Sequence, residues 1–131
     1  MKIKMSVAVA TLMMLALPLA AHAEGDAKKG EKVFKKCKIC HKVGPKAKPG
    51  VGPVLNGIVG RKAATSESFM KKYSAAMKAK GAEGHVWTEE NIAKYLADPK
   101  GYIPKNKMAF VGLKKEQDRA DVIAYLKTFS E

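Results

Sequence analysis

The stretch Cys37-Lys38-Ile39-Cys40-His41 decides the fold of this chain. A Cys-x-x-Cys-His motif is the attachment signature of a c-type haem. Two thiols three positions apart on a helical turn can each add to one vinyl group of the same porphyrin, and the imidazole that follows can bind the iron. No other cysteine occurs in the chain, so no disulfide competes for these two. The motif therefore predicts one haem c, bound covalently through Cys37 and Cys40, with His41 as an iron ligand.

A second interpretation of the same motif is a surface Cys-x-x-Cys redox pair followed by an incidental histidine. Thioredoxin-like pairs of this kind need a strand–helix–strand context. The sequence around the motif shows no such context. A thiol–disulfide oxidoreductase is therefore the weaker alternative.

The first 23 residues are expected to be a secretory signal peptide. A short basic region precedes an apolar run over residues 5–21, and Ala21-His22-Ala23 is an A-x-A-like cleavage site. An uncleaved membrane anchor is the alternative, but the run is slightly short for a full span and Pro18 would break a helix near its end. We therefore expect cleavage after residue 23, which leaves residues 24–131 as one domain and suggests the bacterial periplasm.

Basic residues outnumber acidic residues by 25 to 12 in the whole chain. Lys2 and Lys4 belong to the expected signal peptide, so 23 basic and 12 acidic residues remain in the mature chain, a net charge of +11 before any haem charge. Most of these charges are expected to form a solvated face, yet the excess creates a positive field that favours acidic partners. Export and the absence of a recognised nucleic-acid motif argue against nucleic acid as the partner.

The rest of the pattern predicts an all-α domain of short helices joined by loops, with little strand signal. Helices are expected over residues 26 to about 40, capped by Asp26, over 68–80, over 88–98, capped by Thr88, and over about 116–129. The segment 41–61 is rich in glycine and proline and should form a loop that can wrap close to a flat ligand. A domain of this size has a marginal core, to which a buried macrocycle would add apolar surface.

Several runs of residues point to one family, and they occur in family order over nearly the whole mature chain. They are Gly25-Asp26, Gly30-Glu31-Lys32-Val33-Phe34, the motif itself, Gly52-Pro53-Val54-Leu55, Gly60-Arg61-Lys62, Trp87-Thr88-Glu89-Glu90, Tyr95-Leu96, Asp98-Pro99, Tyr102-Ile103-Pro104, Lys107-Met108 and Asp121 to Leu126. With these runs the chain resembles a class I cytochrome c, of the soluble bacterial branch that is similar to the mitochondrial protein. The resemblance implies short helices and loops wrapped around one covalent haem.

The resemblance also implies that Met108, in a Pro-x-x-Lys-Met loop, is the second iron ligand opposite His41. A thioether opposite an imidazole raises the haem potential. The pair fills both axial positions, which argues against the second alternative, a haem enzyme or gas sensor with an open site. Met70 and Met77 lie at helical spacing and are expected to be core residues, and His85 is the only other histidine of the mature chain.

Further haem contacts follow from the same resemblance. The carbonyl of Pro53 is expected to accept a hydrogen bond from His41, and Tyr95 is expected near the ligand methionine's sulfur. Residues that match the family's propionate-binding side chains are Arg61, Tyr73 and Trp87. The plainer interpretation is that the aromatic residues belong to the core and the arginine is a solvated loop charge. Asn106 stands where mitochondrial relatives carry threonine, and its amide could hydrogen-bond near the haem.

The function that the resemblance implies is that of a soluble periplasmic electron carrier, and not of an enzyme. Such a carrier cycles its iron between Fe(II) and Fe(III) and works as a monomer in respiratory or photosynthetic electron transport. Its expected partners are acidic docking faces of membrane redox complexes: a cytochrome bc1-type donor, and a terminal oxidase or photosynthetic reaction centre as acceptor. Lysines expected near the haem edge are Lys36, Lys38, Lys42, Lys100, Lys105, Lys107 and Lys115.

Overall fold

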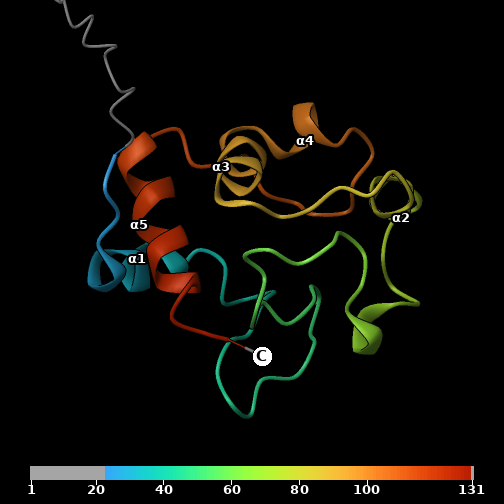
Figure 1. Cartoon of the computed structure of the whole chain (residues 1–131), viewed down its shortest axis with the longest axis horizontal. Helices are drawn as coiled ribbons and strands as arrows, with labels where there is room; N and C mark the ends of the chain where they lie inside the picture. The colour runs from blue at the N-terminus through green and yellow to red at the C-terminus, as the bar shows by residue number, and fades with distance from the viewer. Residues whose placement is uncertain (1–22, 131) are drawn as a thin grey trace, which may run out of the picture.

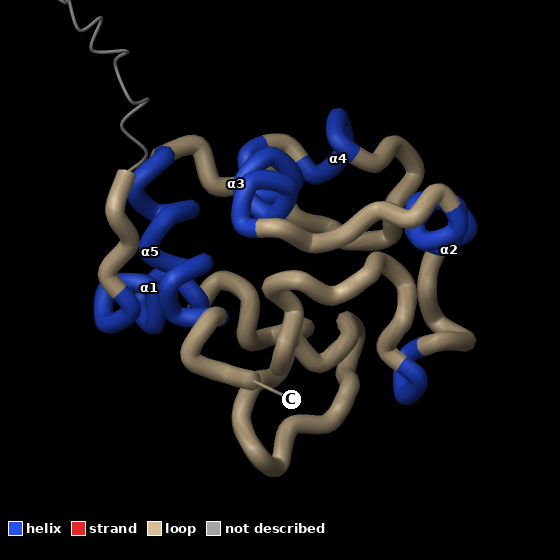
Figure 2. The backbone as a smooth tube through the Cα atoms, in the orientation of Figure 1, coloured by secondary structure: helices blue, strands red, loops and turns tan. Residues whose placement is uncertain are grey.

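The structure, a computed structural model, describes residues 23–130, so the predicted signal peptide lies outside the described residues except for Ala23. The described chain contains five α-helices and one short 3-10 helix around a middle of irregular loops (Figures 1 and 2). No β-strand occurs within residues 23–130, where Lys62 and Val86 form an isolated antiparallel bridge. The all-α prediction is therefore confirmed for this part of the chain.

The first helix, α1, spans Ala27–Phe34 and begins where the sequence predicts. The side chain of Asp26 accepts hydrogen bonds of 2.9 and 3.2 Å from two backbone N–H groups of the first turn, which would otherwise lack partners. The predicted extension to about residue 40 is wrong as a helix. Beyond Phe34 most backbone bonds reach only three residues back, and residues 35–40 form successive turns. These successive turns nevertheless continue from the end of α1 to the Cys-x-x-Cys-His motif.

The last helix, α5, spans Glu116–Leu126 and packs against α1 (Figure 1). Gly30 allows the close approach, because a Cβ atom there would overlap the backbone oxygen of Asp121 and lie 2.8 Å from the Cβ of Tyr125. Asp121 is 3 % exposed, and its side chain accepts a 2.8 Å hydrogen bond from the backbone N–H of Asp26. The two ends of the described chain are thus joined directly.

The segment 68–80, predicted as one helix, is two elements. They are the 3-10 helix η1, Glu67–Phe69, and the α-helix α2, Ala75–Ala82. The side chain of Ser74 accepts a 3.0 Å hydrogen bond from the backbone N–H of Met77. This contact caps α2, so a new helix begins there instead of continuing from η1.

Helix α3 spans Glu89–Ala97, is capped by Thr88 and ends before Asp98, as the sequence predicts. The single turn α4, Pro99–Tyr102, is an element that the pattern does not predict. It starts because the Asp98 side chain accepts a 3.1 Å backbone hydrogen bond and a proline occupies the first position. Helix α5 ends at Leu126, three residues before its predicted end.

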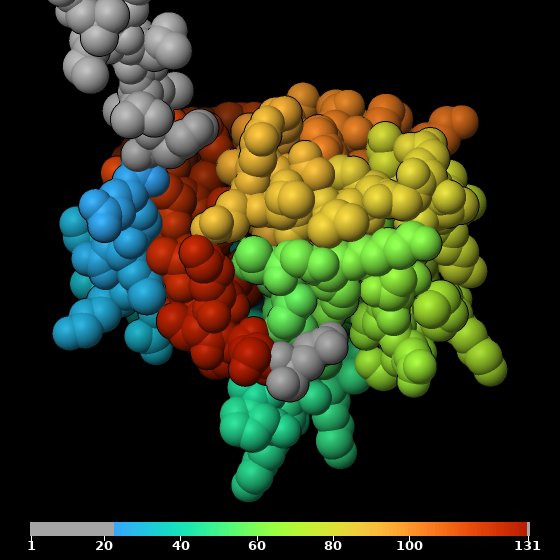
Figure 3. All heavy atoms as spheres, in the orientation of Figure 1, coloured from blue at the N-terminus to red at the C-terminus, as the bar shows by residue number. Residues whose placement is uncertain are grey.

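The core of the described chain collects residues from α1, α3 and α5 and from the loops between them. Its buried members are Phe34, Ile58, Ala63, Trp87, Ile92, Tyr95, Ile103, Leu113, Val122, Ile123 and Leu126. In the space-filling view, segment 41–61 covers the lower part of the molecule, and the region of α3 and α4 covers the upper part (Figure 3). No helix in residues 23–130 is long and apolar enough to cross a membrane.

Candidate functional site

The Cys-x-x-Cys-His motif occupies one turn of the chain after α1. The backbone N–H groups of Cys40 and His41 both donate to the carbonyl of Cys37, at 3.1 and 2.9 Å, so the three side chains project from one turn. Both cysteines are free and half-buried. Burial raises the pKa of Cys37 to about 11. Because the attacking thiol of a redox-active Cys-x-x-Cys pair needs a lowered pKa, this environment argues against Cys37 in that role.

The imidazole of His41 is held from two sides. Its Nδ1 lies 2.8 Å from the carbonyl oxygen of Pro53, so Nδ1–H donates this bond in the neutral ring and Nε2 keeps its lone pair. Gly52 lies against the ring: a Cβ atom there would be 2.7 Å from Nδ1 and 2.9 Å from Nε2. Burial lowers the pKa of His41, the Pro53 bond partly offsets this, and the charge of Arg61 lowers it further. A neutral imidazole of this kind can bind a metal through Nε2.

Arg61 lies on the loop that follows the motif. Its guanidinium donates hydrogen bonds of 3.2 Å to the backbone carbonyls of Val54 and Asn56. The side chain of Asn56 is in turn paired with the backbone of Gly44, donating at 2.7 Å and accepting at 2.8 Å. Side chain-to-backbone hydrogen bonds therefore hold segment 41–61 in place, although it contains no helix or strand.

Met108 lies on the loop between α4 and α5, which is in the upper part of Figure 1, whereas segment 41–61 is in the lower part. The hydroxyl of Tyr95 donates a hydrogen bond to the Met108 sulfur at 3.8 Å. Tyr95 is 8 % exposed, and burial raises its pKa to about 12. The phenol is therefore protonated at neutral pH and acts toward the sulfur as a donor.

Trp87 connects the residues around His41 with those around Met108. Its backbone N–H donates to the carbonyl of Arg61, and the N–H of Gly60 donates to the Trp87 carbonyl, both at 2.8 Å. The indole is 6 % exposed, and its ring centroid lies 5.0 Å from that of Tyr95. Trp87 is thus bonded to Arg61 through the backbone and packed against Tyr95 through its ring.

Tyr73 is buried in a separate set of contacts. Its hydroxyl accepts a 3.2 Å hydrogen bond from the backbone N–H of Ser66, and its ring packs edge-to-face on Phe69 at 5.0 Å between centroids. Neither contact uses the hydroxyl proton of Tyr73. The phenol can therefore still donate to another acceptor.

Two features of the site were missed by the sequence pattern. The sequence indicates Gly52 as a turn former and as part of a run that matches the family, but it does not indicate the close approach to the His41 ring. Its position directly before Pro53 is the one signal that points to the histidine. His85 lies between the rings of Trp87 and Tyr102, at 4.8 and 5.7 Å between centroids, and its Nε2 is buried without a hydrogen-bond partner. Burial, and next the charge of a nearby lysine, lower the pKa of His85.

These donor groups fit a covalently bound haem. Two free thiols on one turn suit the thioether bonds, and a neutral imidazole with a committed Nδ1 suits one axial position. A thioether that accepts a phenol hydrogen bond suits the other axial position. Arginine, tyrosine and tryptophan donors suit the propionate carboxylates, because buried charges need hydrogen-bond partners.

Comparisons with known proteins lead to the same family. The cytochrome c family model matches residues 27–130. Cytochrome c2 of Rhodomicrobium vannielii is 58% identical over 109 residues, which cover 83% of this chain and 83% of that protein. Cytochrome c-550 of Ancylobacter novellus is 54% identical over 102 residues, which cover 78% of this chain and 94% of that protein.

A solved structure adds the evidence of the fold. The structure of cytochrome c2 from Rhodospirillum centenum is 47% identical in sequence and superimposes with a TM-score of 0.76, covering 82% of this chain and 100% of that chain. The predicted class I fold is therefore confirmed. With its attachment motif, its helices and its relatives in agreement, this chain belongs to the cytochrome c family, as a class I cytochrome c of the bacterial kind.

Proposed function

We propose that this chain is an electron carrier that binds one haem c through its two cysteines and through iron ligation by His41 and Met108. The observation that carries the proposal is a pair of orienting contacts. The Pro53 carbonyl fixes the imidazole with Nε2 free, and the Tyr95 hydroxyl directs a hydrogen bond to the methionine sulfur. When bound, the haem supplies an iron couple that changes by one electron, between Fe(II) and Fe(III).

The roles of the protein groups follow from their contacts. His41 and Met108 would occupy both axial positions, which leaves no place for a substrate and favours a carrier over a haem enzyme. His41 is restrained by Pro53 and by the close approach of Gly52, so the protein would hold the imidazole in one orientation toward the iron. Donors proposed to hold the propionates are Arg61, Tyr73 and Trp87.

The ligand set is tested by replacing Met108. In M108A the reduction potential should fall and the iron should bind azide or carbon monoxide, because the axial thioether is gone. Peroxidase-like side activity should rise for the same reason. Met70, expected from the sequence to be a core residue, is instead 41 % exposed. M70A is therefore the matched control, and its potential should equal that of the unchanged protein. An unchanged potential in M108A would contradict the proposal and direct attention to His85.

The covalent attachment has its own test. Haem should stay with the purified polypeptide in denaturing detergent, and changing Cys37 and Cys40 to alanine should prevent stable holoprotein formation. Release of intact haem by acid–organic extraction would contradict the thioether bonds.

The periplasm is the proposed compartment, with residues 1–23 removed as a signal peptide. Relatives named cytochrome c2 support this placement. The intact mass of the protein purified from the periplasm should correspond to a chain that begins at Glu24 and carries one haem. A mass that includes residues 1–23 would favour the membrane anchor instead.

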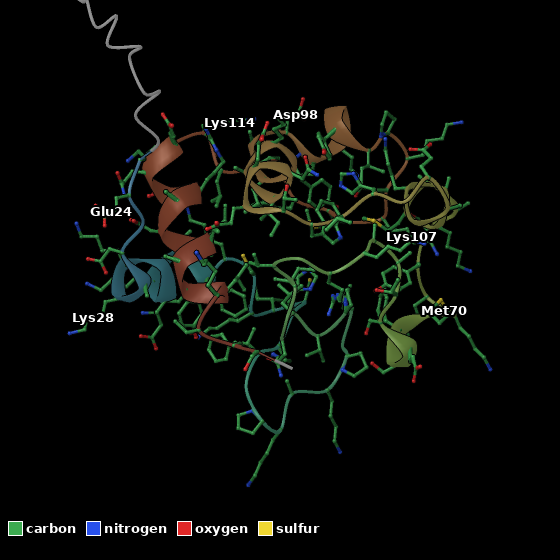
Figure 4. All side chains as sticks on the ribbon, in the orientation of Figure 1. Glu24, Lys28, Met70, Asp98, Lys107 and Lys114 are labelled. Atoms are coloured by element: carbon green, nitrogen blue, oxygen red, sulfur yellow. The ribbon has the colours of Figure 1, made fainter. Side chains whose placement is uncertain are left out.

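Acidic docking faces of membrane redox complexes are the proposed partners: a cytochrome bc1-type donor, and a terminal oxidase or a photosynthetic reaction centre as acceptor. All seven lysines predicted near the haem edge are exposed. Lysines also lie elsewhere on the surface, since Lys28 and Lys107 are at opposite sides of the view in Figure 4. The positive field is therefore broad, and the docking face has to be located by experiment.

Salt and charge reversal locate that face. Electron transfer to a membrane complex should slow as salt rises, because screening shortens the reach of the field to about 8–10 Å near physiological ionic strength. K38E and K107E should slow association more than K78E, although all three lysines are exposed. Equal losses at the three positions would contradict a defined docking face. Deleting the gene and measuring whether light-driven or oxygen-driven electron flow stops would identify the acceptor.

A further inference from the structure

We infer that Asn106 is a positioning residue that holds Met108 in place, and that its amide does not bind the haem. This inference rests on the proposed ligation of iron by Met108. Asn106 is 4 % exposed, in the loop between α4 and the methionine. A buried side-chain amide has one oxygen acceptor and two N–H donors that need hydrogen-bond partners, so the partners of Asn106 indicate its role.

The amide of Asn106 ties Met108 to both ends of α4. Its Nδ2 donates hydrogen bonds of 2.8 Å to the carbonyl of Pro99, the first residue of α4, and of 2.8 Å to the carbonyl of Ile103, directly after α4. Its Oδ1 accepts a 2.8 Å hydrogen bond from the backbone N–H of Met108. The backbone that carries the thioether is therefore fixed to α4 through one side chain.

The main chain of Asn106 is fixed as well. Its backbone N–H donates to the Ile103 carbonyl at 3.2 Å, and its carbonyl accepts a 2.6 Å hydrogen bond from Nζ of Lys100. All three N–H groups of Asn106 are thus committed within the protein. None remains to donate to a haem carboxylate, which separates Asn106 from the proposed propionate donors.

Backbone strain beside Asn106 makes these hydrogen bonds of Asn106 necessary. Lys105 has a φ of 66°, in the left-handed region that residues with a Cβ atom adopt reluctantly. Such a conformation persists only where the surroundings hold it. The bonds of Asn106 supply that restraint on one side of Lys105, so without the amide the loop can relax and carry Met108 away from the Tyr95 hydroxyl.

Imidazole binding to the ferric holoprotein tests the inference. Imidazole reaches the iron only when Met108 leaves, so its apparent affinity reports the fraction of molecules with the methionine displaced. Removing buried hydrogen bonds in N106A should raise this affinity about tenfold. The reduction potential should fall in the same variant. N106T keeps a hydroxyl that can replace part of the amide, and its imidazole affinity should lie between N106A and the unchanged protein.

The matched control is D121A. Asp121 is 3 % exposed and accepts two hydrogen bonds of 2.8 Å, from the backbone of Asp26 and from the side chain of Gln117, in the contact that joins α5 to the start of the chain. D121A should lower the denaturant midpoint as N106A does. It should leave the imidazole affinity and the potential unchanged, because it does not touch the methionine loop.

Each outcome decides a different statement. If N106A and N106T lose stability as D121A does, with imidazole affinity and potential unchanged, Asn106 is merely structural and the inference is overturned. If N106A does not accumulate as holoprotein, N106T decides by the same two measurements. M108A separates the inference from the proposed function: unchanged imidazole affinity in M108A overturns the ligand assignment itself. Tighter imidazole binding in M108A but not in N106A overturns only the role of Asn106.

Discussion

On the histidine side of the site, His41 directly follows the Cys-x-x-Cys pair, packs against Gly52 and donates a hydrogen bond to the Pro53 carbonyl. Side-chain hydrogen bonds to the backbone also hold the surrounding loop. On the methionine side, Met108 lies on a loop in which Lys105 has a left-handed conformation. The side-chain amide of Asn106 connects the Met108 backbone to α4. Many close contacts restrain the imidazole, and few bonds restrain the thioether. We therefore expect the methionine side to open first when the site is perturbed.

The largest expected effect is on the histidine side, in G52A. The added Cβ would overlap the His41 ring, so the ring or the backbone has to shift. Overpacking of this kind costs about 1–3 kcal/mol, and we expect a loss of about 2 kcal/mol in the free energy of unfolding. Guanidinium denaturation of the holoprotein measures it. The control is G50A, whose Cβ would come no closer than 3.3 Å to the carbonyl of Cys40. Equal losses in the two variants would mean that the ring is not closely packed.

Lys105 gives the next largest effect, on the methionine side. K105G and K105A remove the same charge, but only glycine relieves the left-handed strain. The free energy of unfolding of K105G should exceed that of K105A by about 1 kcal/mol. K105G should also bind imidazole several-fold more weakly than K105A does. Ala64, with a φ of 59°, is the control: A64G should also stabilise the fold but leave imidazole binding unchanged. If A64G weakened imidazole binding as much as K105G, the strain would not be specific to the methionine loop.

The sequence predicted the elements with strong local signals. Asp26 and Thr88 cap helices as expected, because a capping side chain needs only its neighbours. The single helix over 68–80 was wrong because the apolar spacing of its residues continues across a break, and periodicity alone does not show that Ser74 starts a new helix. The turn α4 is too short for periodicity to reveal.

The sequence likewise predicted part of the candidate site and missed the rest. The motif pointed to His41 from residue type and spacing, whereas the roles of Pro53 and Met108 were implied by the family resemblance. The sequence does not indicate the close approach of Gly52 to the His41 ring, because that contact depends on how two loop segments meet. It does not indicate the left-handed conformation of Lys105 either, because lysine is not a residue type that favours it. Asn106 was considered for its amide, but its partners are carbonyls of a turn that the pattern did not predict.

A smaller effect is expected in Y95F, which removes the hydrogen bond to the Met108 sulfur. The sulfur then donates more strongly to iron and favours Fe(III), so the potential should fall by less than about 60 mV, from a hydrogen bond worth about 0.5–1.5 kcal/mol. Because the pKa of Tyr95 is about 12, the phenol is protonated throughout the neutral range. The difference in potential between Y95F and the unchanged protein should therefore be constant between about pH 6 and 9. A difference that varies with pH would contradict this role.

The smallest effect concerns His85, beside the aromatic residues of the site. Burial lowers its pKa from 6.5, so the unfolded chain binds a proton at a pH where the folded chain does not. The free energy of unfolding should therefore fall as pH drops below about 6.5. H85F should remove this contribution, and its stability relative to the unchanged protein should improve from pH 7 to pH 5, measured by denaturant unfolding at each pH. Parallel pH profiles would show that His85 titrates alike in both states.

The contact between α1 and α5 has a consequence for the order of folding and haem attachment. Asp26 and Asp121 are 95 positions apart, so their hydrogen bond closes most of the described chain, residues 23–130, into one loop. Amide protons of both helices should exchange with solvent only through global unfolding, whereas the methionine loop can exchange through local opening. Because α5 follows α1 and the Cys-x-x-Cys-His motif in the chain, the α1–α5 contact cannot form until α5 has been synthesised. We expect the two thiols of the motif to remain accessible to haem attachment until then.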